Sequence, residues 1–92
     1  MTHELKILDE YFMEVKKQHK NFELRKNDRN FNVGDDVILK EIDKNGNETG
    51  NIILRKILYV LKDCPEYGLK DGYCILSLGF MWAKEVEEWQ ER

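Results

Sequence analysis

The sequence predicts an α+β fold, in which one helix near the N-terminus is followed by a small mixed or barrel-like sheet and a short C-terminal helix. Three patterns support this class. An apolar stripe with helical spacing follows the first apolar run, the dipeptide Asn45-Gly46 separates two β-branched runs, and the alternating run YCILSLGF precedes the tail. A strand, a helix and then several strands in succession are typical of α+β proteins.

The first part of the chain predicts a strand, a helix and a second strand. HELKIL is a short apolar run, and after it Leu8, Tyr11, Phe12 and Val15 have the i, i+3, i+4, i+7 spacing of one helical face. Acidic residues at the start and lysines near the end favour a helix from about Asp9 to Gln18. NFELR then alternates as a half-buried strand does, and KNDRNFNVGD predicts a loop.

The second part predicts a hairpin, a last strand and a tail helix. DVILKEID and TGNIILRKILYVL flank KNGNE, in which Asn-Gly favours a type I′ turn. The second run is long for one straight strand, so we expect a bend or bulge of the kind that closes small barrels. CPEYGLKDG predicts a loop before the strand YCILSLGF. In MWAKEVEEWQER, the spacing of Trp82, Val86 and Trp89 predicts an amphipathic helix over residues 81–92, which either caps the barrel or forms a homodimer or partner surface.

Length and composition indicate one ordered domain, residues 1–92. No apolar run approaches the roughly 20 residues that a membrane helix needs, and the N-terminus lacks the pattern of a signal peptide. We therefore expect a cytoplasmic protein without membrane contact. Cys64 and Cys74 form no CxxC pair and are expected to be reduced thiols.

Positive charge is concentrated in one stretch of an acidic chain. The formal net charge is −3, yet residues 16–29 contain six Lys or Arg against two acids, a local balance of +4, and the rest of the chain sums to −3 − 4 = −7. A local basic site on an acidic body suits capture of a phosphate or a short strand better than general coating of nucleic acid. A basic but merely solvated surface is the alternative.

The alternation in NFELR predicts how these charges are arranged. If Phe22 and Leu24 are buried, Glu23 and Arg25 share the opposite, outward face of the strand. Arginine donors suit phosphate or a base edge, and a carboxylate suits an amino group. An internally satisfied ion-pair network is the alternative, and His3 could line the same cleft from the first strand. The predicted ligand-binding residues are Lys20, Glu23, Arg25, Lys26, Asn27, Asp28, Arg29 and His3.

Several of these runs carry a resemblance to a known family. HELKIL, the following YF, FELRKNDRNFNVGD and YGLKDGY resemble small bacterial and phage proteins grouped with the ASCH domains of the PUA-like superfamily. The resemblance implies a pseudo-barrel of five or six mostly antiparallel strands beside a cleft that binds RNA or a modified nucleotide. It also implies a lysine, Lys20, followed by polar residues three and five positions later, which are Glu23 and Arg25.

Function is therefore expected to be binding of RNA or a nucleotide in a polar cleft. One ASCH branch is similar to amidohydrolases that use a threonine where this chain has Glu23, and a carboxylate is no simple substitute for a hydroxyl nucleophile. A small hydrolase acting on a modified nucleoside, with Glu23 activating water beside Lys20, stays an alternative, as does an interaction protein that uses the tail helix. The sequence predicts no catalytic triad, no metal site and no cofactor.

Overall fold

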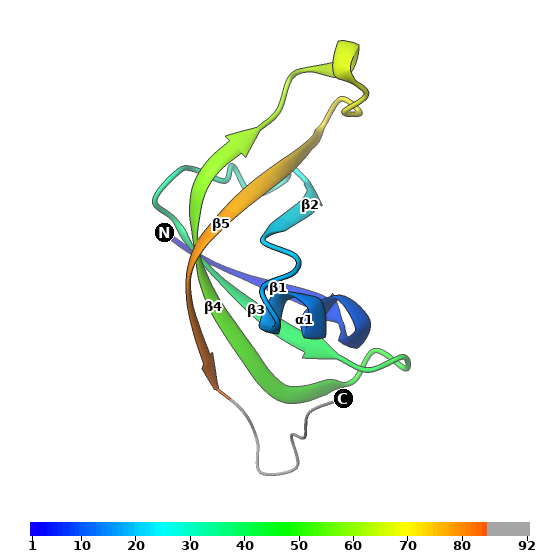
Figure 1. The fold of residues 1–92 in the computed structure, drawn as a ribbon. Coiled ribbons are helices and arrows are strands. Elements are labelled where there is room, and N and C mark those ends of the chain that lie inside the picture. Colours follow the sequence, from blue (N-terminus) through cyan, green and yellow to red (C-terminus); the bar gives the residue numbers. More distant parts are fainter. Residues whose placement is uncertain (85–92) are drawn as a thin grey trace.

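A computed structural model of the chain describes residues 1–84. It confirms the α+β class, with strand as the main component (Figure 1). The elements in chain order are β1 (Thr2–Leu8), α1 (Asp9–Lys16), β2 (Phe22–Lys26), β3 (Asp36–Ile42), β4 (Glu48–Leu61), the short 3₁₀ helix η1 (Pro65–Tyr67) and β5 (Tyr73–Lys84).

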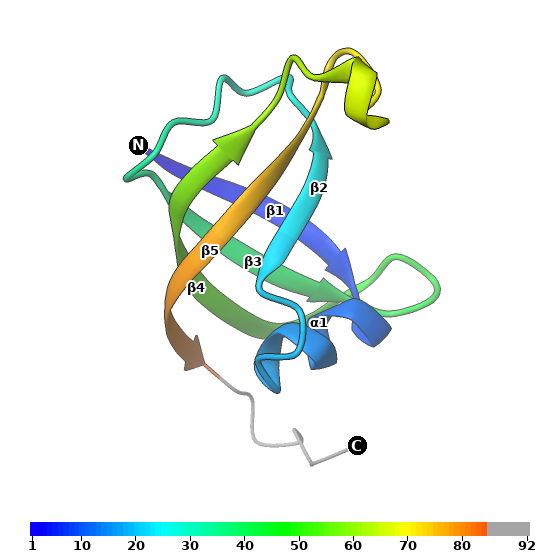
Figure 2. The ribbon, with the colours of Figure 1, turned by 45° about the horizontal axis from the view of Figure 1, so that its top comes forward.

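All five strands belong to one mixed sheet with the order β1-β3-β4-β5-β2. β1 pairs with β3 in parallel, and the other three pairs are antiparallel. β1 and β2 are the edge strands of this sheet, and they do not pair with each other. The sheet curls into a half-barrel, so that the first strand passes behind β2 and β5 with α1 at one end (Figure 2).

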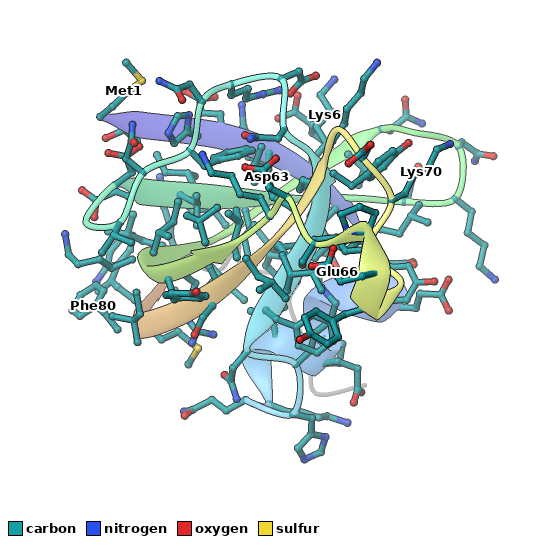
Figure 3. The ribbon with its side chains drawn as sticks, turned by 90° about the horizontal axis from the view of Figure 1, so that it is seen from above. Met1, Lys6, Asp63, Glu66, Lys70 and Phe80 are labelled. Atoms are coloured by element: carbon teal, nitrogen blue, oxygen red, sulfur yellow. The ribbon has the colours of Figure 1, made fainter. Side chains whose placement is uncertain are left out.

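The curl depends on irregular pairing along β4, which is the longest strand. Its register with β5 shifts between Leu54 and Lys56 and again between Ile57 and Tyr59. Extra residues at such bulges bend a strand and increase its twist, as the length of this run predicted. Beyond the half-barrel, the chain between β4 and β5 carries η1 (Figure 1). From above, Glu66 and Lys70 of this connection lie on the opposite side from Met1 and Phe80 (Figure 3).

The interior of the half-barrel is filled by one side of each central strand and by the inner stripe of α1. Buried apolar side chains from β1, β3, β4 and β5 pack with Phe12 and Val15 of the helix and with Phe31 of the loop before β3. The interior also contains a cation. Arg55 is buried and donates to the carbonyls of Leu78 and Gly79 and to Oδ1 of Asn21, and burial lowers the pKa of its guanidinium.

Two local predictions need correction. The helix ends at Lys16 rather than near Gln18, because Gln18 adopts a left-handed φ of 63°. The β3–β4 turn is not type I′, since Gly46 has a positive φ but Asn45 does not. Instead Gly46 N–H donates to the Asp43 carbonyl, which makes a type I turn followed by a left-handed glycine.

The predicted tail helix over residues 81–92 is wrong for its first residues, 81–84. They extend β5, where Trp82 pairs with Leu54 and Ala83 with Ile53, because the long β4 continues to offer backbone partners. Trp82 is half exposed there, while Val86 and Trp89 lie outside the described residues. The homodimer surface therefore stays a prediction. Within residues 1–84, no helix has the length and apolar character that crossing a bilayer requires.

Candidate functional site

A pocket of about 720 Å³ lies at the seam where the two edge strands approach without pairing. This volume is within the range of small-molecule sites in proteins. The pocket is bounded by the end of β1, one side of α1, the α1–β2 turn and all of β2. Its lining residues are Lys6, Ile7, Leu8, Tyr11, Glu14, His19, Lys20, Phe22, Glu23, Leu24, Arg25 and Lys26.

A chain of three charged side chains forms one wall of this pocket. Glu23 is only 4% exposed, and its two carboxylate oxygens accept hydrogen bonds from different cations. Lys20 Nζ donates to Oε1, and Arg25 Nε donates to Oε2 at 2.9 Å. The buried carboxylate is thus neutralised from both sides, and it positions one lysine and one arginine at the pocket.

The orientation of β2 is the reverse of the one that the sequence predicted. Phe22 and Leu24 are 47% and 57% exposed, whereas Glu23 is buried. The alternation separates the two kinds of residue as expected, but it does not say which face is covered. The apolar pair lies on the outer face of an edge strand, and the inner face meets the pocket and the ion-pair chain. The charged side chains of Glu23 and Arg25 therefore point inward, toward the seam between β1 and β2.

Two arginines bridge the seam between the edge strands. Arg25 Nη2 donates to the Lys6 carbonyl at 2.6 Å, and Arg29 Nη1 donates to the Glu4 carbonyl, also at 2.6 Å. Both acceptors belong to the edge of β1 that pairs with no strand within residues 1–84. A guanidinium has five N–H groups, so each arginine has more donors than these contacts use. The seam is therefore held by side chains.

The other cations at the pocket are Lys6, Lys20 and Lys26. Lys20 also donates to the Phe22 carbonyl at 2.9 Å and lies 5.0 Å from the Phe22 ring and 5.9 Å from the Tyr11 ring. The ammonium groups of Lys6 and Lys26 make no hydrogen bond or ion pair with any residue in 1–84. These two lysines carry charge that no described neighbour neutralises.

The predicted residues after β2 lie beyond the pocket lining. Asn27 is held by its backbone N–H, which donates to the Gly72 carbonyl, and its side-chain Oδ1 is buried without a hydrogen-bond partner in the described part of the chain. Asp28 is exposed, with Oδ1 3.9 Å from Arg29 Nε. The structure thus brings Lys20, Glu23, Arg25 and Lys26 together and leaves Asn27, Asp28 and Arg29 outside the pocket lining.

His3 is separate from this pocket. It is buried at the start of β1, where Nε2 lies 2.8 Å from Asp35 Oδ2 and the ring packs edge-on against Phe31 at 4.7 Å. The hydrogen bond with His3, with smaller contributions from the Asn32 N–H and the N-terminal amine, lowers the pKa of Asp35 to about 2 against the opposing effect of burial. This cluster fixes the loop before β3 to the first strand.

The predicted ligand-binding residues do not include eight residues that line the pocket, namely Lys6, Ile7, Leu8, Tyr11, Glu14, His19, Phe22 and Leu24. Tyr11 belongs to the predicted apolar stripe, but it lies at the edge of that stripe and is half exposed, while Phe12 and Val15 fill the core. Its aromatic character within the stripe was the available signal. Among residues 1–84, no group of three His, Cys, Asp or Glu side chains is placed to hold a metal ion.

Comparison with known proteins gives one family. Residues 2–78 match the family described as "Domain of unknown function (DUF3850)". The chain belongs to this family. No curated protein matches it. The matched range includes every residue that lines the pocket and ends inside β5, before Gly79, so the pocket lies wholly within the family domain.

Proposed function

We propose that this protein binds RNA or a nucleotide in the pocket at the β1–β2 seam. The observation that carries the proposal is the pairing of two un-neutralised cations, Lys6 and Lys26, with an apolar and aromatic wall in one pocket of about 720 Å³. Ammonium groups attract phosphate as point charges, and aromatic side chains offer stacking surfaces to bases. The resemblance of the E-x-R-K-N-D-R run to ASCH domains of the PUA-like superfamily supports the same ligand class.

Glu23 gives the pocket a second feature, which is a buried carboxylate. Both of its oxygens accept from cations, so the carboxylate orients Lys20 and Arg25 toward the pocket. Arg25 has N–H groups left over from its contacts with Glu23 and Lys6, and these can bind a phosphate oxygen or a base acceptor. In this arrangement phosphate lies toward the cationic rim and a base lies toward Tyr11 and Phe22.

The test is a charge deletion at the rim. The double variant Lys6→Ala, Lys26→Ala is expected to weaken binding of a fluorescein-labelled oligouridylate RNA, measured by fluorescence anisotropy. The slope of log affinity against log salt is expected to fall by about 0.7 for each lysine that contacts a phosphate of a single strand. Neither lysine has a described partner, so thermal unfolding should change little.

Lys84→Ala supplies the matched control, because Lys84 is exposed and lies beyond the part of β5 that pairs with β2. It removes one lysine outside the pocket lining, so its effect is compared with half of the change in the double variant. If the double variant and this control have the same affinity and salt slope as the unmodified protein, the pocket is not the nucleic-acid site.

A hydrolase acting on a modified nucleoside is a second candidate, favoured by the hydrogen bond between Lys20 and Glu23 within the pocket wall. Glu23 would have to release one cation before it could activate water, since both oxygens are occupied. Incubation of concentrated protein with acylated nucleosides, followed by chromatography, tests this activity. Absence of product at high protein concentration removes the candidate.

A further inference from the structure

The outer face of the sheet next to the pocket is apolar and aromatic, with Phe22, Leu24 and Tyr59 about half exposed or more and the β5 residues between them partly exposed. Residues that pair directly across adjacent strands lie on the same face of a sheet. Two rows of paired residues cross β2, β5 and β4 on this face. Phe22, Ser77 and Tyr59 form one row. Leu24, Ile75 and Leu61 form the next row, and Figure 2 shows the three strands side by side. We call this surface, together with Lys26 and its partner Tyr73, the outer face.

The outer face continues directly into the pocket. Phe22, Leu24 and Lys26 belong to both, because β2 is an edge strand whose rim is the boundary between them. Tyr59 on β4 is 60% exposed and lies two strands away from that rim. A ligand that begins in the pocket can therefore extend over β2 and β5 to Tyr59 without leaving the protein surface.

The charge on the outer face itself is positive. None of its residues is acidic, and Lys26 is its charged member. Two further lysines border it at the aromatic rings: Lys20 Nζ lies 5.0 Å from the Phe22 ring, and Lys70 Nζ lies 5.5 Å from the Tyr73 ring. This is unexpected in a chain of net charge −3. A second copy of the chain would bring the same lysines and no carboxylate to pair with them.

We infer that the outer face is a stacking platform for single-stranded RNA, whose backbone enters the pocket and whose following bases stack on Phe22, Tyr59 and Tyr73. The inference rests on the proposed function and deepens it, since it makes the ligand a strand of several nucleotides. Exposed aromatic side chains with flanking cations are what proteins use to bind unpaired bases. A base-paired duplex has no free base faces for such a platform, so it is a poor ligand.

The experiment compares three ligands on the full chain: uridine monophosphate, an oligouridylate of about eight nucleotides and an RNA duplex of the same length. Calorimetry and anisotropy should show the single strand binding at least about tenfold more tightly than either of the others. Tyr59→Leu keeps the bulk of the side chain but removes the ring. It should weaken the single strand by at least about fivefold and leave the affinity for the monophosphate unchanged.

Two control variants separate stacking from other effects. Tyr59→Phe keeps the ring and should bind as the unmodified protein does, and Tyr67→Ala removes an exposed ring of η1 that lies off the outer face and should also have no effect. Equal affinity for monophosphate and single strand, with no effect of Tyr59→Leu, overturns the platform and leaves the proposed function standing. Failure of all three ligands to bind overturns the proposed function itself. Self-association that Tyr59→Leu abolishes would assign the face to a second copy and overturn the inference.

Discussion

Arg25→Ala is expected to destabilise the protein by about 2–3 kcal/mol, because this side chain joins the two edges of the sheet. Its guanidinium donates to Glu23 at 2.9 Å and to the Lys6 carbonyl at 2.6 Å. Hydrogen bonds that involve a charged group contribute about 1.5–3 kcal/mol each, which gives about 3–6 kcal/mol for the pair. The side chain is 26% exposed, so water replaces part of this loss in the variant.

The assay is thermal unfolding followed by circular dichroism. In a domain of this size 1 kcal/mol corresponds to about 4–8 °C, so the expected decrease in Tm is about 10–20 °C. Arg29→Ala is the matched control, since Arg29 donates to the neighbouring β1 carbonyl of Glu4 but is 47% exposed and lacks a buried carboxylate partner. We expect it to cost less than about 1 kcal/mol. Equal, small decreases for both variants would refute the view that Arg25 holds the seam.

Two further predictions concern the loop before β3 and the bulge in β4. The pKa of Asp35 is about 2 in the folded protein against 3.8 when unperturbed, so its stabilising effect is complete above about pH 4 and is lost as the pH falls toward 2. The difference in urea midpoint between the unmodified protein and Asp35→Asn should therefore shrink over that interval, and a constant difference would contradict the assignment. Gly79→Ala places a Cβ 2.6 Å from a methyl group of Leu58, an exposed side chain that must change rotamer to make room, and should cost about 0.5–1.5 kcal/mol. Adding Leu58→Ala should remove that increment, and an unchanged increment in the double variant would exclude this clash.

The sequence predicted the elements of this fold better than their faces. Apolar runs and helical spacing located α1 and the strands, and the excess length of TGNIILRKILYVL indicated the bend that β4 makes at two bulges. The alternation predicted for β2 was correct in period and wrong in direction. Alternation places residues on two faces, but it does not show which face of an edge strand the rest of the chain covers. Phe22 and Leu24 stay about half exposed beside β5, whereas Glu23 on the opposite face is buried.

The candidate site could be predicted only where its residues are close in the chain. Lys20, Glu23, Arg25 and Lys26 lie in one short stretch, and the structure keeps them together at the pocket. His3 is different, since its partner Asp35 is 32 residues away and the contact exists only because β1 pairs in parallel with β3. Lys6 likewise meets β2 only where the two edge strands approach each other. The sequence of either segment alone does not predict long-range pairing of this kind.

Arg25 and Glu23 contribute both to the stability of the seam and to the proposed ligand site. Arg25 lines the pocket and also spans the edges of β1 and β2, so a loss of ligand binding in Arg25→Ala follows either from a missing contact or from a loosened wall. Glu23 has the same double role through Lys20 and Arg25. Lys6 and Lys26 have no side-chain partner among the described residues. Their ammonium groups can therefore be removed without opening the seam. Substitutions at these two positions measure how much the pocket contributes to ligand affinity, separately from stability.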